Sequence, residues 1–375
     1  MYRLVILIIL FFFSLLTLFK APTYHLWLIA ITVTEFSLLF CCFTILILFS
    51  GFGVNRYSFA GTITGVIALI LYLSPVLKAY FISKDLRTGI YAEFGTNMQT
   101  DKAPFNLLGM FTSINNTSIP SKKLSYIAYP DKILTLDFYP ARDAGKRPCV
   151  IVIHGGSWKS GDNKQLPELN SYLATSGYHV AAINYRLAPD YQNPLPVDDV
   201  KAAIRYLKDH ADKLKIDSGN FVLLGRSAGA QIALLAAYTL KIPEIKGVID
   251  FYGPADMVWG YSVPSSPLVM NSRKVMEDYL GGTYHDVPDN YAASSPLNYV
   301  SAASVPTLII HGENDVLVAY EHSLRLQRKL NEKGVKNYFL SIPWATHGFD
   351  YTINGPGGQL STFAVFSFLN SVTIN

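Results

Sequence analysis

The chain has 375 residues, of which 50% are hydrophobic and 15% are charged, and its formal net charge at pH 7 is +4. This composition excludes a disordered chain, and without a basic run in the C-terminal part we expect no nucleic-acid binding. The charges are unevenly placed, because residues 1–83 carry five of them and the other 292 residues carry 53. We therefore expect an apolar N-terminal region followed by a globular domain.

Three apolar segments predict about three transmembrane helices, at about residues 4–19, 26–49 and 59–82 of the region 1–83. The second and third are long enough to cross the ~30 Å hydrocarbon core of a bilayer. The first would form about 24 Å of helix and can also be read as a signal peptide. Residues 18–22 lack a small-x-small cleavage pattern, so we expect an uncleaved anchor. The chain is thus expected to be an integral membrane protein with the lipid bilayer as a partner.

The basic residues near these segments predict their orientation. Three crossings would place Arg3 and Arg56 on the side of the N-terminus. Lys20, Lys84 and Arg87 would lie on the opposite side, that of the C-terminal domain, and Lys78 would lie close to the boundary of the third segment. By the positive-inside rule this favours a cytoplasmic C-terminal domain. Overlapping glycosylation sequons in residues 115–118 point to the opposite side in a secretory context.

Glu35 lies near the middle of the second apolar segment, where an ionisable side chain is costly. We expect it to be a neutral, hydrogen-bonded packing residue, with an ion or proton pathway as the alternative. A transporter or channel has little support, because three segments with a single internal acid offer no obvious pathway.

Residues 84–120 predict a connector with one short helix, and residues 121–375 predict a catalytic domain. Its expected strands are residues 124–129, 133–139, 149–154, 179–185, 221–225, 247–252, 307–311 and 338–342, and its expected helices are residues 167–176, 197–214, 227–240, 320–333 and 359–369. A tight turn at Pro130-Asp131 indicates that the first two strands form a hairpin. The later strands are continuous apolar runs, as in strands covered on both faces by helices. We expect an α/β fold with an eight-stranded, mostly parallel, doubly wound sheet.

In such a sheet the functional residues follow the carboxyl ends of the strands. After the strand at residues 221–225 the chain reads Gly225-Arg226-Ser227-Ala228-Gly229 and enters a predicted helix. This strand, turn and helix context is that of a nucleophile elbow, in which the serine hydroxyl is exposed at a sharp turn. Ser227 is the candidate nucleophile, although a serine at this place also serves as a helix cap.

A serine nucleophile needs a base and an acid that orients the base. Asp315 follows the strand at residues 307–311, and His347 follows the last predicted strand. The order Ser, Asp, His is that of the α/β-hydrolase fold. Glu313 is the alternative acid, and we expect His311 to have a structural role.

Donors for an oxyanion are expected where glycines expose backbone N–H groups. The strand at residues 149–154 runs into Gly155 and Gly156, and Ala228 directly follows the nucleophile. These three residues are the predicted oxyanion hole. We expect His154 to be structural, because it precedes the glycines that supply the donors.

Residues from about 120 to 375 resemble the α/β-hydrolase carboxylesterases of the hormone-sensitive-lipase-like and feruloyl-esterase-like group. The matching stretches are His154-Gly155-Gly156-Ser157-Trp158, Asn184-Tyr185-Arg186-Leu187-Ala188-Pro189, Asp198-Asp199-Val200-Lys201-Ala202-Ala203, Gly225-Arg226-Ser227-Ala228-Gly229-Ala230 and His311-Gly312-Glu313-Asn314-Asp315. The resemblance implies the same triad and oxyanion residues. Arg226 departs from it, because lipase-like relatives usually carry Asp there. Prenylcysteine methylesterases also join membrane helices to such a domain.

An insertion at about residues 253–305 separates the sixth and seventh predicted strands. It contains large apolar residues, namely Met257, Trp259, Tyr261, Leu268, Met270 and Tyr279. In this fold an insertion at that position can lie over the pocket, where such side chains would suit an apolar acyl or aryl group. The alternative is that they pack the insertion onto the domain.

The candidate triad and the apolar N-terminal segments together predict a membrane-anchored serine carboxylesterase. We expect it to hydrolyse small-molecule esters through an acyl-enzyme, with no metal and no cofactor. Whether the substrate is lipophilic stays open. Because His347 must be neutral to accept a proton, we expect activity to fall below a pH of about 6 to 7. The alternatives are a narrow-specificity esterase, such as a prenylcysteine methylesterase, and a catalytically idle hydrolase-fold binding module.

Overall fold

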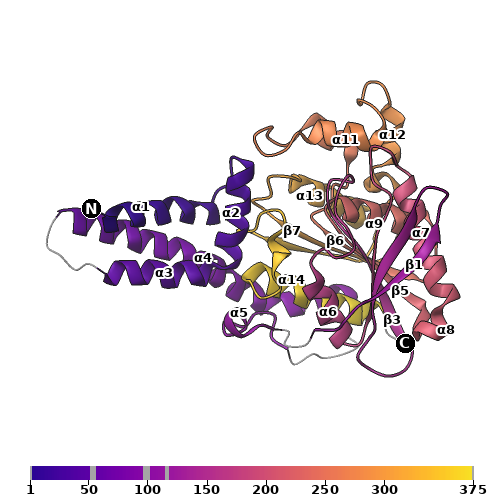
Figure 1. The fold of residues 1–375 in the computed structure, drawn as a ribbon, viewed down its shortest axis with the longest axis horizontal. Coiled ribbons are helices and arrows are strands. Elements are labelled where there is room, and N and C mark those ends of the chain that lie inside the picture. Colours follow the sequence, from indigo (N-terminus) through magenta and orange to yellow (C-terminus); the bar gives the residue numbers. More distant parts are fainter. Residues whose placement is uncertain (1, 51–55, 96–101, 115–117, 374–375) are drawn as a thin grey trace.

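A bundle of helices projects from one end of an α/β domain (Figure 1). The computed structural model describes residues 2–50, 56–95, 102–114 and 118–373. Asn115 and Asn116 of the predicted glycosylation sequons lie outside the described residues.

The N-terminal region folds into four helices. They are α1 (Tyr2–Ser14), which continues as the 3-10 turn η1 (Leu15–Thr17), α2 (Tyr24–Glu35), α3 (Ser37–Phe49) and α4 (Arg56–Phe94). Helices α1, α3 and the first half of α4 pack side by side, and α2 lies across their base (Figure 1). Leu7, Val33 and Tyr72 are buried between the helices, whereas Phe12 and Leu46 are exposed on the outside. A bundle that is apolar on its outer surface suits a lipid environment.

The prediction of about three membrane-spanning helices is wrong. Among the described residues, α4 is the one helix that is long and apolar enough to cross a membrane by itself, over Ser58–Phe94. The predicted span at residues 26–49 divides at Phe36 into α2 and α3, which are bent by 85° and count at most as one broken span. The first segment, Tyr2–Thr17, is a shorter apolar helix. The bend brings Glu35 against the α/β domain, as described below.

Eight strands form one sheet in the order β1-β2-β4-β3-β5-β6-β7-β8. They are β1 (Lys122–Ala128), β2 (Ile133–Tyr139), β3 (Arg147–Ile153), β4 (His179–Ile183), β5 (Ile216–Arg226), β6 (Ile245–Phe251), β7 (Thr307–Gly312) and β8 (Asn337–Ile342). β1 and β2 form an antiparallel hairpin and β2 is antiparallel to β4, while the remaining pairs are parallel. The predicted eight-stranded, mostly parallel sheet is confirmed.

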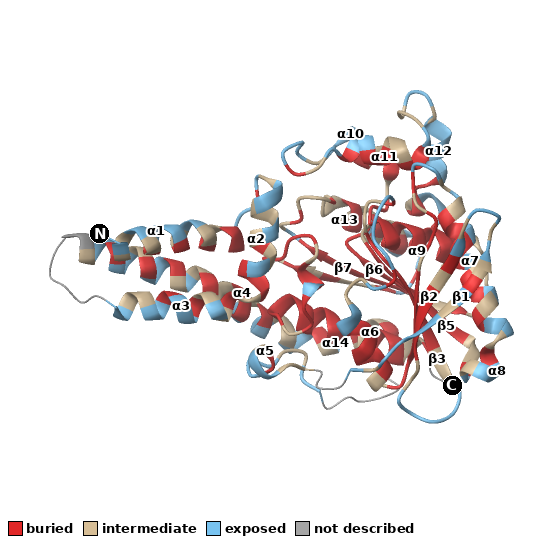
Figure 2. Ribbon diagram, in the orientation of Figure 1, coloured by how far each residue is buried: buried red, intermediate tan, exposed pale blue. Residues whose placement is uncertain are grey.

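Helices cover both faces of the sheet. The helices and 3-10 turns after α4 are α5 (Gly109–Thr112), α6 (Pro167–Thr175), α7 (Leu195–Asp209), α8 (Ala211–Leu214), α9 (Ala228–Thr239), α10 (Met257–Ser262), α11 (Ser272–Leu280), α12 (Pro288–Ala293), η2 (Pro296–Tyr299), α13 (Glu321–Glu332), η3 (Phe349–Tyr351) and α14 (Pro356–Val372). Helices α11 and α12 lie beyond the edge of the sheet rather than on a face (Figure 1). Along β3 the side chains alternate, so that Ile151 and Ile153 join a core with α7, α9 and α13, whereas Val150 and Val152 join one with α6, α14 and α4. The core residues of both layers are almost fully buried (Figure 2).

Helix α4 continues to Phe94, although the sequence predicted a connector from residue 84. Its last turns bury Leu86, Ile90 and Phe94 in the core that also contains α14. A helix of 39 residues is about 58 Å long, nearly twice the thickness of a bilayer's hydrocarbon core. The first half of α4 therefore belongs to the bundle and the second half to the domain, because burial of its C-terminal face sustains the helix past the apolar segment.

Candidate active site

Ser227 occupies a sharp turn between β5 and α9. Its backbone has φ 54° and ψ −122°, in the left-handed range of φ that is strained for a residue with a side chain. The turn demands glycine at Gly229, where a Cβ would lie 2.2 Å from the carbonyl oxygen of Ile153. The local sequence thus folds as predicted for an elbow, with the serine at the carboxyl edge of the sheet.

Asp315 and His347 form a buried pair on the loops that follow β7 and β8. The Nδ1 atom of His347 lies 2.7 Å from Oδ2 of Asp315. The other carboxylate oxygen, Oδ1, accepts hydrogen bonds from the backbone amides of Leu317 and Val318 at 2.8 and 2.9 Å. These contacts fix the carboxylate and hold the imidazole by its Nδ1 side, which leaves Nε2 as the atom that can act as a base.

A second histidine touches the same carboxylate. Nε2 of His311 lies 3.2 Å from Oδ2 of Asp315, and its Nδ1 lies 2.7 Å from Oγ of Ser323. Burial raises the pKa of Asp315, but the charge of His347 and the hydrogen bonds of both histidines outweigh it, so this pKa lies well below its usual range. Asp315 is therefore ionised at neutral pH, as an orienting acid must be. His311 supports this carboxylate.

The glycine-rich loop after β3 lies next to Ser227. A Cβ on Gly155 would lie 3.3 Å from the Cβ of Ser227, so the two backbones are close together. The N–H of Gly155, however, donates a 2.8 Å hydrogen bond to Oε1 of Gln165 and is engaged in this structure. Gly156 adopts φ 125° and has no room for a side chain, because a Cβ would lie 2.0 Å from the carbonyl oxygen of Ser160.

His154, which precedes this loop, is buried and stacks on Tyr185 with ring centroids 4.3 Å apart. Its Nδ1 lies 2.7 Å from the carbonyl oxygen of Gly155. Burial lowers the pKa of His154, so the ring is neutral. These contacts agree with the structural role that we expected for it.

Arg226, the departure from the family pattern, makes a buried ion pair with Asp350. Nε of Arg226 lies 2.5 Å from Oδ2 of Asp350, and the hydroxyl of Tyr252 donates to the other oxygen of that carboxylate. Arg226 precedes Ser227 and Asp350 follows His347 by three residues, so the ion pair joins the turn at Ser227 to the loop that carries His347. The sequence marks Arg226 as unusual, but no local pattern predicts that Asp350 is its partner.

Helix α2 contributes two contacts that sequence reasoning missed. Nε1 of Trp27 donates a 2.9 Å hydrogen bond to the backbone oxygen of His347. Oε2 of Glu35 accepts hydrogen bonds from the amides of Gly357 and Gly358, at 3.0 and 3.1 Å. Glu35 is thus a hydrogen-bonded packing residue at the N-terminus of α14.

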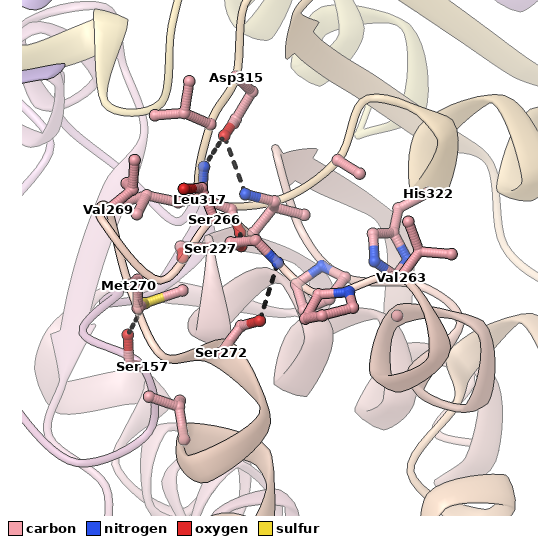
Figure 3. Close-up of a pocket in the computed structure, with 18 of the residues that line it drawn as sticks. Ser157, Ser227, Val263, Ser266, Val269, Met270, Ser272, Asp315, Leu317 and His322 are labelled. Atoms are coloured by element: carbon pink, nitrogen blue, oxygen red, sulfur yellow. Dashed lines mark hydrogen bonds between the residues drawn. The ribbon is translucent and has the colours of Figure 1, made fainter. Parts of the chain in front are cut away.

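A cavity of about 340 Å³ opens in front of Ser227 and Ala228, with Asp315 in its wall (Figure 3). Most of the other lining residues are apolar, as is usual for small-molecule sites. Burial lowers the pKa of His322, which also lines the cavity, to about 3, so this imidazole is uncharged at neutral pH.

The insertion supplies much of the cavity lining, but Met270 is the one residue among its six named large apolar residues that lines it. Met270 lines the cavity, and its sulfur accepts a hydrogen bond from Oγ of Ser157 at 3.7 Å. Met257 and Tyr279 instead have no exposed surface and belong to the core of the domain. Met270 thus lies at the cavity, whereas Met257 and Tyr279 pack the insertion onto the domain. Within the described part of the chain, no three or more His, Cys, Asp or Glu side chains are grouped so that they could hold a metal ion.

The chain is similar in sequence to known esterases. The chain is 28% identical over 261 residues to Esterase LipC and 27% identical over 242 residues to Probable carboxylic ester hydrolase LipM, both of Mycobacterium tuberculosis. These matches cover 64% and 61% of this chain but only 63% and 55% of the relatives, so the chain spans less than two thirds of their length.

Solved esterase structures share the fold. An esterase of Pyrobaculum calidifontis superimposes with a TM-score of 0.60 at 20% identity, covering 80% of this chain and 95% of that one. A truncated carbohydrate esterase from gut microbiota superimposes with a TM-score of 0.55 at 21% identity, covering 68% and 98%. The α/β domain thus has the α/β-hydrolase fold. The family described as BD-FAE matches residues 136–330, more than half of the sequence, and the chain therefore belongs to the BD-FAE family.

Proposed function

We propose that the chain is a membrane-anchored serine carboxylesterase in which Ser227 is the nucleophile, His347 the base and Asp315 the orienting acid. The observation that carries the proposal is the 2.7 Å contact between Nδ1 of His347 and the carboxylate of Asp315. Two backbone amides donate hydrogen bonds to that carboxylate, and Asp315 lines the same cavity as Ser227. The names of the curated relatives, esterases and a carboxylic ester hydrolase, support the same reaction class.

The proposed reaction follows from these roles. Nε2 of His347 takes the hydroxyl proton of Ser227 while its Oγ attacks the ester carbonyl carbon, and Asp315 stabilises the imidazolium that forms. The tetrahedral intermediate then collapses, and the alcohol leaves with the proton from His347. Water next attacks the acyl-enzyme with His347 as base again, which releases the carboxylic acid and restores the serine.

The oxyanion of the intermediate needs N–H donors close to the nucleophile. We assign this role to the amides of Gly156 and of Ala228, the first residue of α9, where the helix dipole also favours negative charge. The amide of Gly155 donates to Gln165, so Gly155 is proposed to contribute by letting the loop approach Ser227 closely. Rotation of Gln165 would add Gly155 as a third donor.

The anchoring half of the proposal rests on α4. Its Ser58–Phe94 stretch meets the length and hydropathy expected of a membrane span, and α1 and α3 pack beside it with apolar side chains on their outer surfaces. The cytoplasmic orientation expected from the basic residues assumed three crossings, so it does not carry over to a single span by α4. A narrow-specificity esterase acting at the membrane is the second candidate, favoured by the direct contact between α2 and the histidine loop.

The test is hydrolysis of a p-nitrophenyl ester series, from acetyl to palmitoyl, by membranes that contain the wild type or Ser227→Ala. Activity that is lost in the variant supports the esterase, and the optimum chain length measures the acyl pocket. A folded wild type that hydrolyses none of these esters above background would refute general carboxylesterase activity.

A further inference from the structure

The cavity in front of Ser227 has a wall that comes from the membrane-side region of the chain. Lys20, Ala21 and Pro22, between η1 and α2, line it together with residues of the loop that joins α10 to α11. The backbone N–H of Tyr24 donates a 3.0 Å hydrogen bond to the carbonyl oxygen of Leu268 and so ties the two walls together.

The exposure of the lining residues locates the mouth of the cavity. Lys20 and Pro22 on one wall, and Val263 and Pro264 on the other, are solvent-exposed. Other lining residues on both walls are buried, among them Ala21 and Val269, which are 4% and 7% exposed. The cavity therefore opens between residues 18–24 and residues 263–268.

Large apolar side chains surround this mouth. Phe19 and Leu268 are 62% and 69% exposed, and Leu18, Tyr24 and Val263 are also exposed. A cluster of exposed apolar side chains is costly in water and marks an interaction surface. Because both walls contribute to it, we call the five residues the apolar rim.

The apolar rim continues into the helix bundle. Leu18 and Phe19 directly follow η1, the end of the first bundle helix, and the exposed Leu28 lies one turn into α2 beyond Tyr24. In Figure 1, α2 and the loop before α11 both lie at the end of the domain from which the bundle projects. A bilayer that surrounds the bundle would meet the rim at its surface, with the Lys20 ammonium at the level of the lipid head groups.

We infer that the mouth faces the bilayer and that the substrate is a lipophilic ester which enters from the membrane, with its hydrocarbon chain passing the apolar rim and its carbonyl carbon reaching Ser227. This inference rests on the proposed esterase function and names its substrate class. Val275 and Met276, in the buried part of the walls, are apolar and suit a hydrocarbon chain better than a sugar or a charged acid. The buried polar lining residues are Ser272, Asp315 and His322.

The experiment uses the full chain reconstituted in phosphatidylcholine vesicles and compares two esters, water-soluble p-nitrophenyl acetate and bilayer-dissolved p-nitrophenyl palmitate. The measured quantity is the ratio of kcat/KM for the palmitate to kcat/KM for the acetate. In the double variant Phe19→Ser/Leu268→Ser this ratio is expected to fall at least tenfold. The matched control Ile133→Ser/Tyr299→Ser replaces two exposed apolar side chains outside the apolar rim, and it should change the ratio less than twofold.

A rim variant that keeps the wild-type ratio would overturn the inference, as would a wild type that cleaves the acetate but not the vesicle-bound palmitate. Both results leave the esterase proposal standing. Loss of all ester hydrolysis in the wild type, or hydrolysis that survives in Ser227→Ala, refutes the esterase proposal itself.

Surface dilution of the wild type gives a second test that does not depend on a variant folding correctly. The palmitate is kept at a fixed bulk concentration while ester-free lipid is added to the same vesicles. If the ester enters from the bilayer, the rate falls in proportion to its mole fraction in the membrane. A rate that follows only the bulk concentration contradicts entry from the membrane.

Discussion

The indole Nε1 of Trp27 donates a hydrogen bond to the backbone carbonyl oxygen of His347, a residue 320 positions later in the chain. The two rings also lie close together, with centroids 6.4 Å apart. At the other end of the same helix, Glu35 accepts hydrogen bonds from the amides of Gly357 and Gly358. Helix α2 is thus fastened at both ends to the segment that carries the proposed base.

Trp27→Phe keeps an aromatic ring but removes the N–H donor. Because one hydrogen bond contributes about 1 kcal/mol net, we expect kcat for p-nitrophenyl butyrate to fall about fivefold as the histidine loop loses its fixed position. KM should stay within twofold of the wild type. Trp259→Phe, which removes an indole from α10 instead, is the control and should leave kcat unchanged. Equal effects of both substitutions would show that Trp27 does not position His347.

The buried ion pair of Arg226 and Asp350 should dominate the stability of this part of the domain. Arg226→Met leaves the Asp350 carboxylate buried with one partner fewer, and we expect the free energy of unfolding to fall by about 3 to 5 kcal/mol. The double variant Arg226→Met/Asp350→Asn should lose less than the sum of the two single variants. Thermal unfolding of the four detergent-purified proteins gives the loss of stability of each variant. Losses of the two single variants that add up to the loss of the double variant would exclude a direct interaction.

Asp250 gives the domain a pH dependence of stability. Burial raises the pKa of Asp250 from 3.8 to about 7, against the opposing effects of the Gly253 amide and the His311 charge. The folded state therefore holds this proton more tightly than the unfolded state. Stability linked to Asp250 is complete below pH about 4 and is lost as the pH rises to about 7, a change on the order of 4 kcal/mol.

Asp250→Asn should remove this contribution while keeping the oxygen that accepts from the amide of Gly253 at 2.7 Å. Unfolding midpoints measured from pH 4 to pH 8 should decline less steeply in the variant than in the wild type. Parallel curves for the two proteins would mean that Asp250 does not titrate in this range.

Two carboxylates compete for the role of orienting acid, and substitution separates them. Asp315→Asn removes the charge that holds His347, and we expect kcat to fall by a factor on the order of 10⁴. Glu313→Gln should change kcat less than twofold, because Glu313 is exposed and accepts a hydrogen bond from Ser341 rather than from a histidine. The opposite ranking of the two variants would transfer the role to Glu313.

Local patterns in the sequence predicted most of the strands and the turn at Ser227. The continuous apolar runs predicted the strands, and β2 begins and ends where it was expected, at Ile133 and Tyr139. The glycines around Ser227 predicted the elbow, because strand, turn and helix propensities are properties of neighbouring residues. The order of the loops after β5, β7 and β8 predicted that Asp315 and His347 would meet at one edge of the sheet.

Contacts between distant segments decided the rest. Residues 26–49 have the composition of one span, yet they bend at Phe36, and Glu35 next to the bend is buried against amides more than 300 positions away. Likewise, no local pattern predicted the ion pair of Arg226 with Asp350, or that Lys20 lines the cavity beside Ser227. Periodicity and turn chemistry act over a few residues, so the sequence by itself determined the elements and the candidate triad. Only contacts between segments far apart in the chain decided which partner each buried polar side chain has and which residues enclose the cavity, because these contacts form when the helices and strands pack together.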